Sequence, residues 1–351
     1  MGYLLDSMKE VLDLLIVVIN GPIQEQGLSV LKEYTNRIYI RENTGYDGGA
    51  YKDAILNLIP EHELQKYDEL VLFNDTFYGP LFGSWKPIFK RFEEIETDFW
   101  GLSKWLPGFV YMPEYSYIPA HVQAYFLVIR KCMLINECFY TFWRQLVSPM
   151  SYKEAVYNFE VGFSVYFRNH NFQYKTWIEV SGGDVYLKPG EAVYIAHAGD
   201  LVMQSGFPVI KKKAIFLTNF TQAFKALDYV RKYSLYHADW IEAEIVRYEH
   251  SSFPYLNIEE FYHRHNNIYI FGYGKWGRGL ESYFSYKGWK IKSFVVTRRE
   301  PDAPHLMELD ELKLNDKDGL IVALGREQRK QIVPLLIKRL NDKDILLPEE
   351  R

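Results

Sequence analysis

Apolar and polar positions in the first 75 residues follow two different periods. Within residues 4–13, one face of a helix collects Leu4, Leu5, Met8, Val11 and Leu12. A continuous apolar run over residues 14–19, closed by an Asn-Gly-Pro turn, predicts a buried strand. The same reasoning predicts helices over 28–35 and 50–58 and strands over 37–40 and 70–73. This alternation indicates an α/β fold with a mostly parallel sheet.

The rest of the chain predicts three further parts. A loop rich in Pro, Tyr and Gly over 103–119 precedes a strand over 124–129 and helices over 135–146 and 152–169. Short segments over 188–213 lead into a helical, aromatic connector over 215–265. Strands over 268–271, 290–296 and 319–324, with a helix after the first, predict a small Rossmann-like unit. We therefore expect domains over residues 1–214, 215–265 and 266–351.

Composition narrows the class of protein. The 351 residues are 48% hydrophobic with a formal net charge of −4, which allows packed cores and argues against a nucleic-acid-binding protein. The two cysteines, Cys132 and Cys138, exclude a cysteine-built metal site and fit a reducing cytoplasm. No apolar run is long enough to span a bilayer, and acidic residues interrupt the N-terminal segment. We expect a soluble cytoplasmic protein, at most peripheral to the inner face of the membrane.

Two short stretches carry the candidate chemistry. Residues 42–53 place glycines and acids between a predicted strand and a predicted helix, where glycine lets the backbone approach a ligand closely. Residues 68–76 form an apolar strand that ends at Asn74 and Asp75. Ligands of open α/β sheets bind outside the carboxyl ends of strands. Asp75 is therefore where we expect a metal ion or a sugar nucleotide.

These stretches resemble the donor site of GT-A-type glycosyltransferases, with a Rossmann-type nucleotide-sugar domain. The closer similarity is to the rhamnan synthesis F family of bacterial polysaccharide rhamnosyltransferases. Six blocks in the family's order carry it: residues 42–52, 74–81, 98–103, 121–126, 142–143 and 157–163. The family pattern has one more strand ahead of the first helix, so either the given sequence starts late or another element fills that position.

The resemblance implies inverting transfer of a deoxysugar, L-rhamnose from dTDP-L-rhamnose, to a lipid-linked or growing glycan acceptor. It implies that Asp75 holds a divalent cation, Mg²⁺ or Mn²⁺, against the donor diphosphate, although Phe73 stands where a second acid is usual. Glu160 is then the catalytic base. The implied donor-binding residues are Asn43, Gly45, Asp47, Gly48, Gly49 and Asn74. The implied acceptor-binding residues are Asp98, Trp100, His121 and Gln123.

Each position also has a purely structural interpretation. Asp75 can cap the turn that follows it, and the glycine-rich stretch can be a simple turn. Glu160 can be a solvated helix carboxylate, and His121 a hydrogen-bonded turn residue. Trp100 is either a sugar-stacking platform or a core residue, and its burial decides between them. The basic run over residues 211–213 is interpreted as a solvated face.

A second glycine motif, Gly272-x-Gly274-x-x-Gly277, lies at a strand-to-helix junction typical of nucleotide binding. The next strand ends without the acid that would bind an NAD ribose, and its Arg298 and Arg299 suit a phosphate-bearing ligand better. Two rival functions therefore remain. One is a catalytically inactive scaffolding or sugar-nucleotide-binding protein, and the other a nucleotide-dependent oxidoreductase built on the C-terminal domain.

Overall fold

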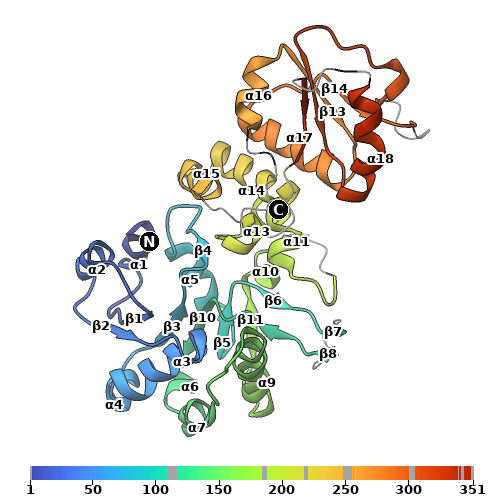
Figure 1. Cartoon of the computed structure of the whole chain (residues 1–351). Helices are drawn as coiled ribbons and strands as arrows, with labels where there is room; N and C mark the ends of the chain where they lie inside the picture. The colour runs from blue at the N-terminus through green and yellow to red at the C-terminus, as the bar shows by residue number, and fades with distance from the viewer. Residues whose placement is uncertain are drawn as a thin grey trace. The chain divides into compact units, whose positions relative to one another are not determined.

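A computed structural model describes residues 2–109, 117–183, 188–216, 220–247, 255, 257–299, 305–338, 340 and 344–348. The chain divides into two compact units (Figure 1). The first comprises Met1–His197, Leu201–Lys211 and Ser234–Tyr236, and the second comprises Ala198–Asp200, Lys212–Tyr233 and His237–Arg351. The helices that we predicted as a connector therefore group with the C-terminal sheet.

The central sheet of the first unit has four strands in the order β11-β5-β10-β3. Their bounds are β3 Glu69–Phe73, β5 Phe99–Gly101, β10 Phe126–Arg130 and β11 Tyr174–Thr176. The α/β class is confirmed, but the mostly parallel sheet is a correction, because β10 runs antiparallel to both β3 and β5. Phe126 lies opposite Phe73, and Leu127 lies opposite Gly101. The last residues of β3 and β5 therefore share one edge of the sheet.

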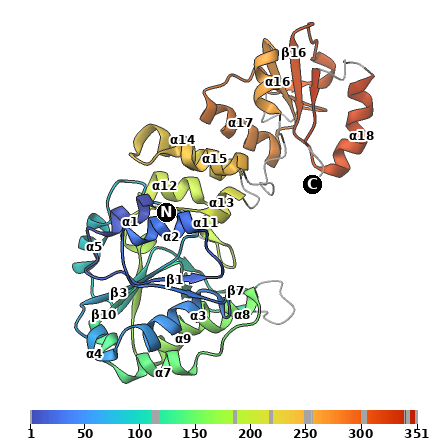
Figure 2. The same cartoon turned by 60° about the vertical axis from the view of Figure 1, so that its left-hand side comes forward.

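Side chains of this sheet alternate between two cores, as the period of a strand requires. On one side, Phe99, Leu127 and Leu72 pack against helices α3, α7 and α9. On the other, Trp100 and Phe126 pack against α1 and α5. Figure 2 shows these two groups of helices on opposite faces of the sheet. The helices are α1 Gly2–Met8, α3 Tyr46–Asp53, α5 Lys86–Glu93, α7 Glu137–Gln145 and α9 Gly162–Asn169.

A separate parallel pair lies beside this sheet, formed by β1 (Val17–Asn20) and β2 (Ile38–Arg41) with α2 (Glu25–Lys32) between them. In the residues that the structure describes, β1 does not pair with β3. A cavity of about 2020 Å³ lies between β1 and β3 and is lined by both of these strands along their length. The run over residues 14–19, predicted as fully buried, is only partly buried because β1 presents its second edge to this cavity.

The predicted helix over 152–169 forms, with a π-helical segment inside it. α8 (Tyr152–Glu154) continues into the π-helix η2 (Ala155–Val161) and then into α9. Ser151 caps its start by accepting a hydrogen bond from the Glu154 amide. Single π-turns within α-helices are frequent at functional sites, and this one carries Glu160.

The second unit holds a parallel sheet in the order β15-β14-β13-β16-β17. Its strands are β13 Asn267–Phe271, β14 Ser293–Val296, β15 Met307–Glu308, β16 Asp318–Val322 and β17 Ile345–Leu346. Helices α17 (Lys275–Lys287) and α18 (Arg326–Ile337) accompany it. Helix α14 (Phe220–Tyr233) packs on α17, with the Phe224 and Tyr283 rings 4.8 Å apart. No helix of the described residues is long and apolar enough to cross a membrane.

Candidate active site

The turn after β3 is capped by Asn74. The Asn74 side-chain oxygen accepts hydrogen bonds from the Thr76 amide (3.1 Å) and the Thr76 hydroxyl (2.5 Å). The alternative interpretation of Asp75 assigned it this capping role, which Asn74 fulfils instead. Asp75 is exposed at the carboxyl end of β3, where its carboxylate can meet a ligand.

The glycine-rich segment is shaped by close contacts. Gly45 has φ +78° and precedes α3. A Cβ on Gly49 would lie 2.4 Å from the Thr44 carbonyl oxygen, and one on Gly48 would lie 2.9 Å from the Phe159 side chain. Gly48 therefore lets α3 pack tightly against η2, the helix that carries Glu160, and Gly49 lets the preceding loop approach α3 closely.

Arg41, at the end of β2, fixes the loop before these glycines. Its guanidinium donates to the Asn20 side-chain oxygen (2.6 Å) and to the Thr44 carbonyl (2.9 Å), and it pairs with Asp53 at 2.7 Å. Asn43 lies exposed in the same loop. The predicted donor-binding segment is thus a loop that Arg41 holds in place and whose outer side faces solvent.

Asp47 joins the two sequence motifs. Its carboxylate accepts a hydrogen bond of 2.7 Å from the Asn74 side chain, 27 residues further along the chain. Desolvation raises the pKa of Asp47, and the charges of Asp75 and Glu160 raise it further, although the Asn74 hydrogen bond and the Lys211 charge oppose this. Three predicted acids therefore share one electrostatic site.

Glu160 forms a pair with His121. Its Oε1 lies 3.3 Å from His121 Nε2, and its Oε2 accepts a hydrogen bond of 2.9 Å from the Ala124 amide. Burial alone would raise the pKa of Glu160. The hydrogen bond and charge of His121, the Ala124 amide and the Lys211 charge together outweigh burial and lower it. The Glu160 side chain as a whole is 22% exposed, so it is only partly buried.

The His121 ring is oriented by backbone. Its Nδ1 lies 2.8 Å from the Pro119 carbonyl, which can only accept, so Nδ1 carries a proton. The contact between Nε2 and Glu160 then requires one further proton shared by the two side chains. His121 itself is buried, so of this pair only Glu160 can meet an acceptor hydroxyl.

Gln123 lies deeper than the prediction implied. It is 4% exposed, and its side-chain oxygen accepts a 2.6 Å hydrogen bond from the Ser103 hydroxyl, which also lies 2.7 Å from the Tyr125 hydroxyl. The Tyr125 ring carries the ammonium of Lys211 above it, at 3.9 Å from the ring centroid. Gln123 therefore supports the wall of the site and does not line its open surface.

Lys211 is the site residue that the sequence reasoning missed. We interpreted residues 211–213 as a solvated face, but Lys211 is 5% exposed and donates a hydrogen bond to the Thr76 hydroxyl. A run of three lysines carries no signal that separates a buried member from exposed ones. The signal that existed was the apolar stretch just before it, which includes Phe207, Val209 and Ile210, all of them buried.

Asp98 and Trp100 lie away from this site, and their predicted acceptor contacts are corrected here. Trp100 has no exposed surface and stacks on Phe92 with ring centroids 4.0 Å apart, so its burial assigns it to the core. Asp98 precedes β5, at the opposite edge of the sheet from Asp75. There its carboxylate accepts hydrogen bonds from the Gln173 amide (2.7 Å) and the Cys132 thiol (3.3 Å).

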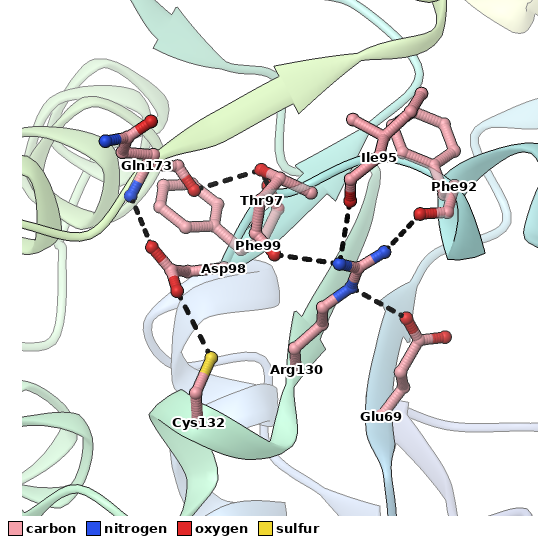
Figure 3. Close-up of polar contacts among 9 residues, drawn as sticks. All are labelled: Glu69, Phe92, Ile95, Thr97, Asp98, Phe99, Arg130, Cys132 and Gln173. Carbon is pink, nitrogen blue, oxygen red and sulfur yellow. Dashed lines mark hydrogen bonds and ion pairs between the residues drawn. The ribbon is translucent and has the colours of Figure 1, made fainter.

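A structural network surrounds Asp98 at this far edge (Figure 3). The Arg130 guanidinium donates to the carbonyls of Ile95 (2.9 Å), Thr97 (3.0 Å) and Phe92, and it pairs with Glu69 at 3.4 Å. These contacts join the end of α5 and the segment before β5 to β10. Asp98 and Trp100 therefore stabilise the fold.

The predicted cation can be compared with the donor set at the site. In the part of the chain that the structure describes, no group of three or more His, Cys, Asp or Glu side chains forms a metal cage. Mg²⁺ commonly takes only one or two carboxylates and completes its shell with phosphates and waters. The exposed carboxylates of Asp75 and Asp47 fit that second arrangement.

The C-terminal glycine motif has a different geometry at each position. Gly272 has φ +105°, and a Cβ there would lie 2.8 Å from the Ala323 carbonyl oxygen. A Cβ on Gly277 would lie 2.0 Å from the Gly272 carbonyl oxygen, whereas one on Gly274 would meet nothing within 4 Å. Arg299 pairs with Glu311 at 2.7 Å. Packing therefore accounts for the first and third glycines of the motif.

Comparisons with known proteins agree with the first unit's motifs. A sequence model of the family described as rhamnan synthesis protein F matches residues 15–270. The uncharacterized protein y4gN of Sinorhizobium fredii (strain NBRC 101917 / NGR234) is 27% identical over 149 residues, which are 42% of this chain and 36% of that protein. The chain thus matches only about a third of that relative's length. No solved structure matches the chain significantly.

Proposed function

Because the chain belongs to the rhamnan synthesis protein F family, we propose that it is a glycosyltransferase of polysaccharide synthesis. It transfers a deoxysugar, L-rhamnose from dTDP-L-rhamnose, to a growing or lipid-linked glycan with inversion at the anomeric carbon. The observation that supports this is the Asn74–Asp47 hydrogen bond, together with the charge interactions that join Asp47 to Asp75 and Glu160. Residues far apart in the sequence form one acidic site at one sheet edge.

Each group of residues at this site has a separate role in the proposed reaction. The loop over residues 43–49 binds the nucleotide sugar beside Asp75. Glu160 accepts the proton of the acceptor hydroxyl while that oxygen attacks the anomeric carbon from the face opposite the diphosphate. The bond between the anomeric carbon and the diphosphate oxygen breaks, and dTDP leaves with the electron pair. A divalent cation held by Asp75 and Asp47 would offset the negative charge of the diphosphate.

His121 positions the base. Its protonated Nδ1 is fixed by the Pro119 carbonyl, and its Nε2 faces Glu160 at 3.3 Å. This contact holds Glu160 in the ionised form that can accept a proton, and it fixes the direction in which the carboxylate points. The Glu160 side chain is also partly exposed, as that of a base that meets an external acceptor must be.

The experiment is a calorimetric titration of dTDP-L-rhamnose, with UDP-glucose and NADH as comparison ligands, with and without Mg²⁺ or Mn²⁺. We expect cation-dependent binding of dTDP-L-rhamnose that Asp75→Asn weakens at least 10-fold. The matched control is Asp68→Asn, at the opposite end of β3, where Asp68 forms an exposed ion pair with Lys131 at 3.4 Å. Equal binding by both variants would refute the donor site, and no nucleotide-sugar binding at all would favour the scaffolding alternative.

A further inference from the structure

Lys211 is held at the candidate site by a short antiparallel ribbon. It ends β12 (Ile210–Lys211), which pairs with β4 (Phe77–Tyr78) so that Lys211 lies opposite Phe77. The Leu81 amide donates to the Pro208 carbonyl at 2.8 Å and extends this contact. The ribbon begins directly after Asp75 and Thr76, so its geometry fixes the lysine next to the end of β3.

The ammonium group of Lys211 lies in an aromatic and hydroxyl environment. Its Nζ lies 3.9 Å from the Tyr125 ring centroid and 5.9 Å from that of Tyr194, and it donates to the Thr76 hydroxyl. Cation–π contacts stabilise the charged form of a lysine that is largely removed from water. The Tyr125 ring is in turn fixed by the Ser103 hydroxyl at 2.7 Å. Lys211 is therefore a positioned positive charge, unlike a mobile surface lysine.

This charge acts inside the acidic site. The Thr76 hydroxyl that accepts from Lys211 also donates to the Asn74 side-chain oxygen at 2.5 Å, and the Asn74 side chain donates to Asp47 at 2.7 Å. The ammonium therefore belongs to the hydrogen-bonded network of the candidate site, and its charge lowers the pKa of both Asp47 and Glu160. Burying a lysine costs free energy unless its charge is paired and hydrogen-bonded. The nearby carboxylates can pair with this charge, and an anionic ligand bound between them can pair with it as well.

We infer that Lys211 contacts the diphosphate of the donor and stabilises it as a leaving group. This inference rests on the proposed function. A lysine ammonium is a compact point charge that commonly binds phosphate. When the anomeric carbon–oxygen bond breaks, its electron pair stays on the terminal diphosphate oxygen, and the Lys211 ammonium donates a hydrogen bond to that oxygen without losing its proton. The ligand class is a nucleoside diphosphate.

The experiment compares binding of dTDP, UDP, inorganic pyrophosphate and thymidine by calorimetry, in Mg²⁺ and in EDTA. The variants are Lys211→Met, Lys211→Arg and, as a control from the same basic run, Lys213→Met. We expect Lys211→Met to weaken dTDP and pyrophosphate at least 10-fold and to leave thymidine unchanged. Lys211→Arg should recover part of the loss, and Lys213→Met should bind like the wild type. If Lys211→Met does not fold, Lys211→Gln supplies the same comparison.

The outcomes separate this inference from the proposed function. Unchanged diphosphate binding in Lys211→Met, with rhamnosyl transfer intact in the wild type, would overturn the role of Lys211 and leave the function standing. Diphosphate binding that depends on Lys211, without any sugar transfer, would support the role of Lys211 and refute the proposed function. Equal losses for dTDP and thymidine would mean that Lys211 only supports the fold. A wild type that binds no diphosphate would overturn the inference.

Discussion

Replacing Glu160 by glutamine should separate catalysis from stability at this site. Glutamine has nearly the same shape, so its side-chain oxygen can still accept from the Ala124 amide, now 2.9 Å from Glu160. Because His121 Nδ1 donates to the Pro119 carbonyl, a neutral His121 can accept a hydrogen bond at Nε2 from the new amide. Both contacts of Glu160 can therefore survive, and only their charged character is lost.

Two quantities should change in Glu160→Gln, the unfolding free energy and the rate of sugar transfer. A hydrogen bond to a charged group contributes about 1.5–3 kcal/mol and a neutral one about 0.5–1.5 kcal/mol. Because both contacts of Glu160 lose their charged character, Glu160→Gln should cost about 2–3 kcal/mol of unfolding free energy. Loss of a general base should lower the transfer rate about 10²- to 10⁴-fold. Urea denaturation measures the first quantity, and release of dTDP in the presence of acceptor measures the second.

The pH dependence supplies a second readout. The folded-state pKa of Glu160 is lowered by His121, Ala124 and Lys211 acting against burial. The stability that Glu160 contributes is therefore present above its unfolded pKa of about 4.3 and is lost as pH falls through the lower folded value. The stability difference between wild type and Glu160→Gln should therefore shrink as pH falls below about pH 4.

Glu154 provides the matched control for this experiment. It lies on the same helical segment and also accepts a backbone hydrogen bond, from the Met150 amide at 2.8 Å. Glu154→Gln should therefore lose little transfer activity. The reasoning is refuted if Glu160→Gln transfers sugar within a few-fold of the wild-type rate, or if Glu154→Gln loses as much.

Three further predictions concern packing. Gly49→Ala should lower the unfolding free energy measured by urea denaturation by about 1–3 kcal/mol, because its Cβ would strike the Thr44 carbonyl. In the control Gly27→Ala, the new Cβ meets a flexible side chain at 3.3 Å, and the loss should be less than about 0.5 kcal/mol. Trp100→Phe should lower the unfolding free energy by about 1–3 kcal/mol yet leave the KM for the acceptor unchanged, and a raised KM would restore the sugar-platform role. Gly277→Ala should melt the second unit at lower temperature than Gly274→Ala, and equal melting would contradict the packing explanation.

Local patterns predicted the elements of this chain well. The strand predicted over 268–271 forms over 267–271, the strand predicted over 124–129 forms over 126–130, and the helix predicted over 152–169 forms with a π-segment inside it. These elements have strong apolar periods of 2 or 3.6 residues, and their tertiary contacts favour the same secondary structure as the local pattern. The position of Asp75 at a strand end followed from the same reasoning.

Predictions failed where the answer depended on pairing across long sequence separations. The antiparallel placement of β10 between β3 and β5 is not visible in any local pattern. Trp100 follows Phe99 on one strand, and both are fully buried because helices cover both faces of the sheet at that point. A sequence block can therefore match a family at Asp98 and Trp100 for reasons of folding alone.

The charges at the edge of the first sheet connect the proposals. Asp47, Asp75 and Glu160 bring three carboxylates to a place where a diphosphate would have to bind, and anions repel one another most strongly where water is partly excluded. Lys211 supplies one positive charge, which is already shared with Asp47 and Glu160. A diphosphate therefore needs further positive charge beside Asp75 and Asp47, and a divalent cation meets that need. Under the proposed function, Lys211 and the cation would act on the same phosphate charge, and the donor would bind tightly only when both are present.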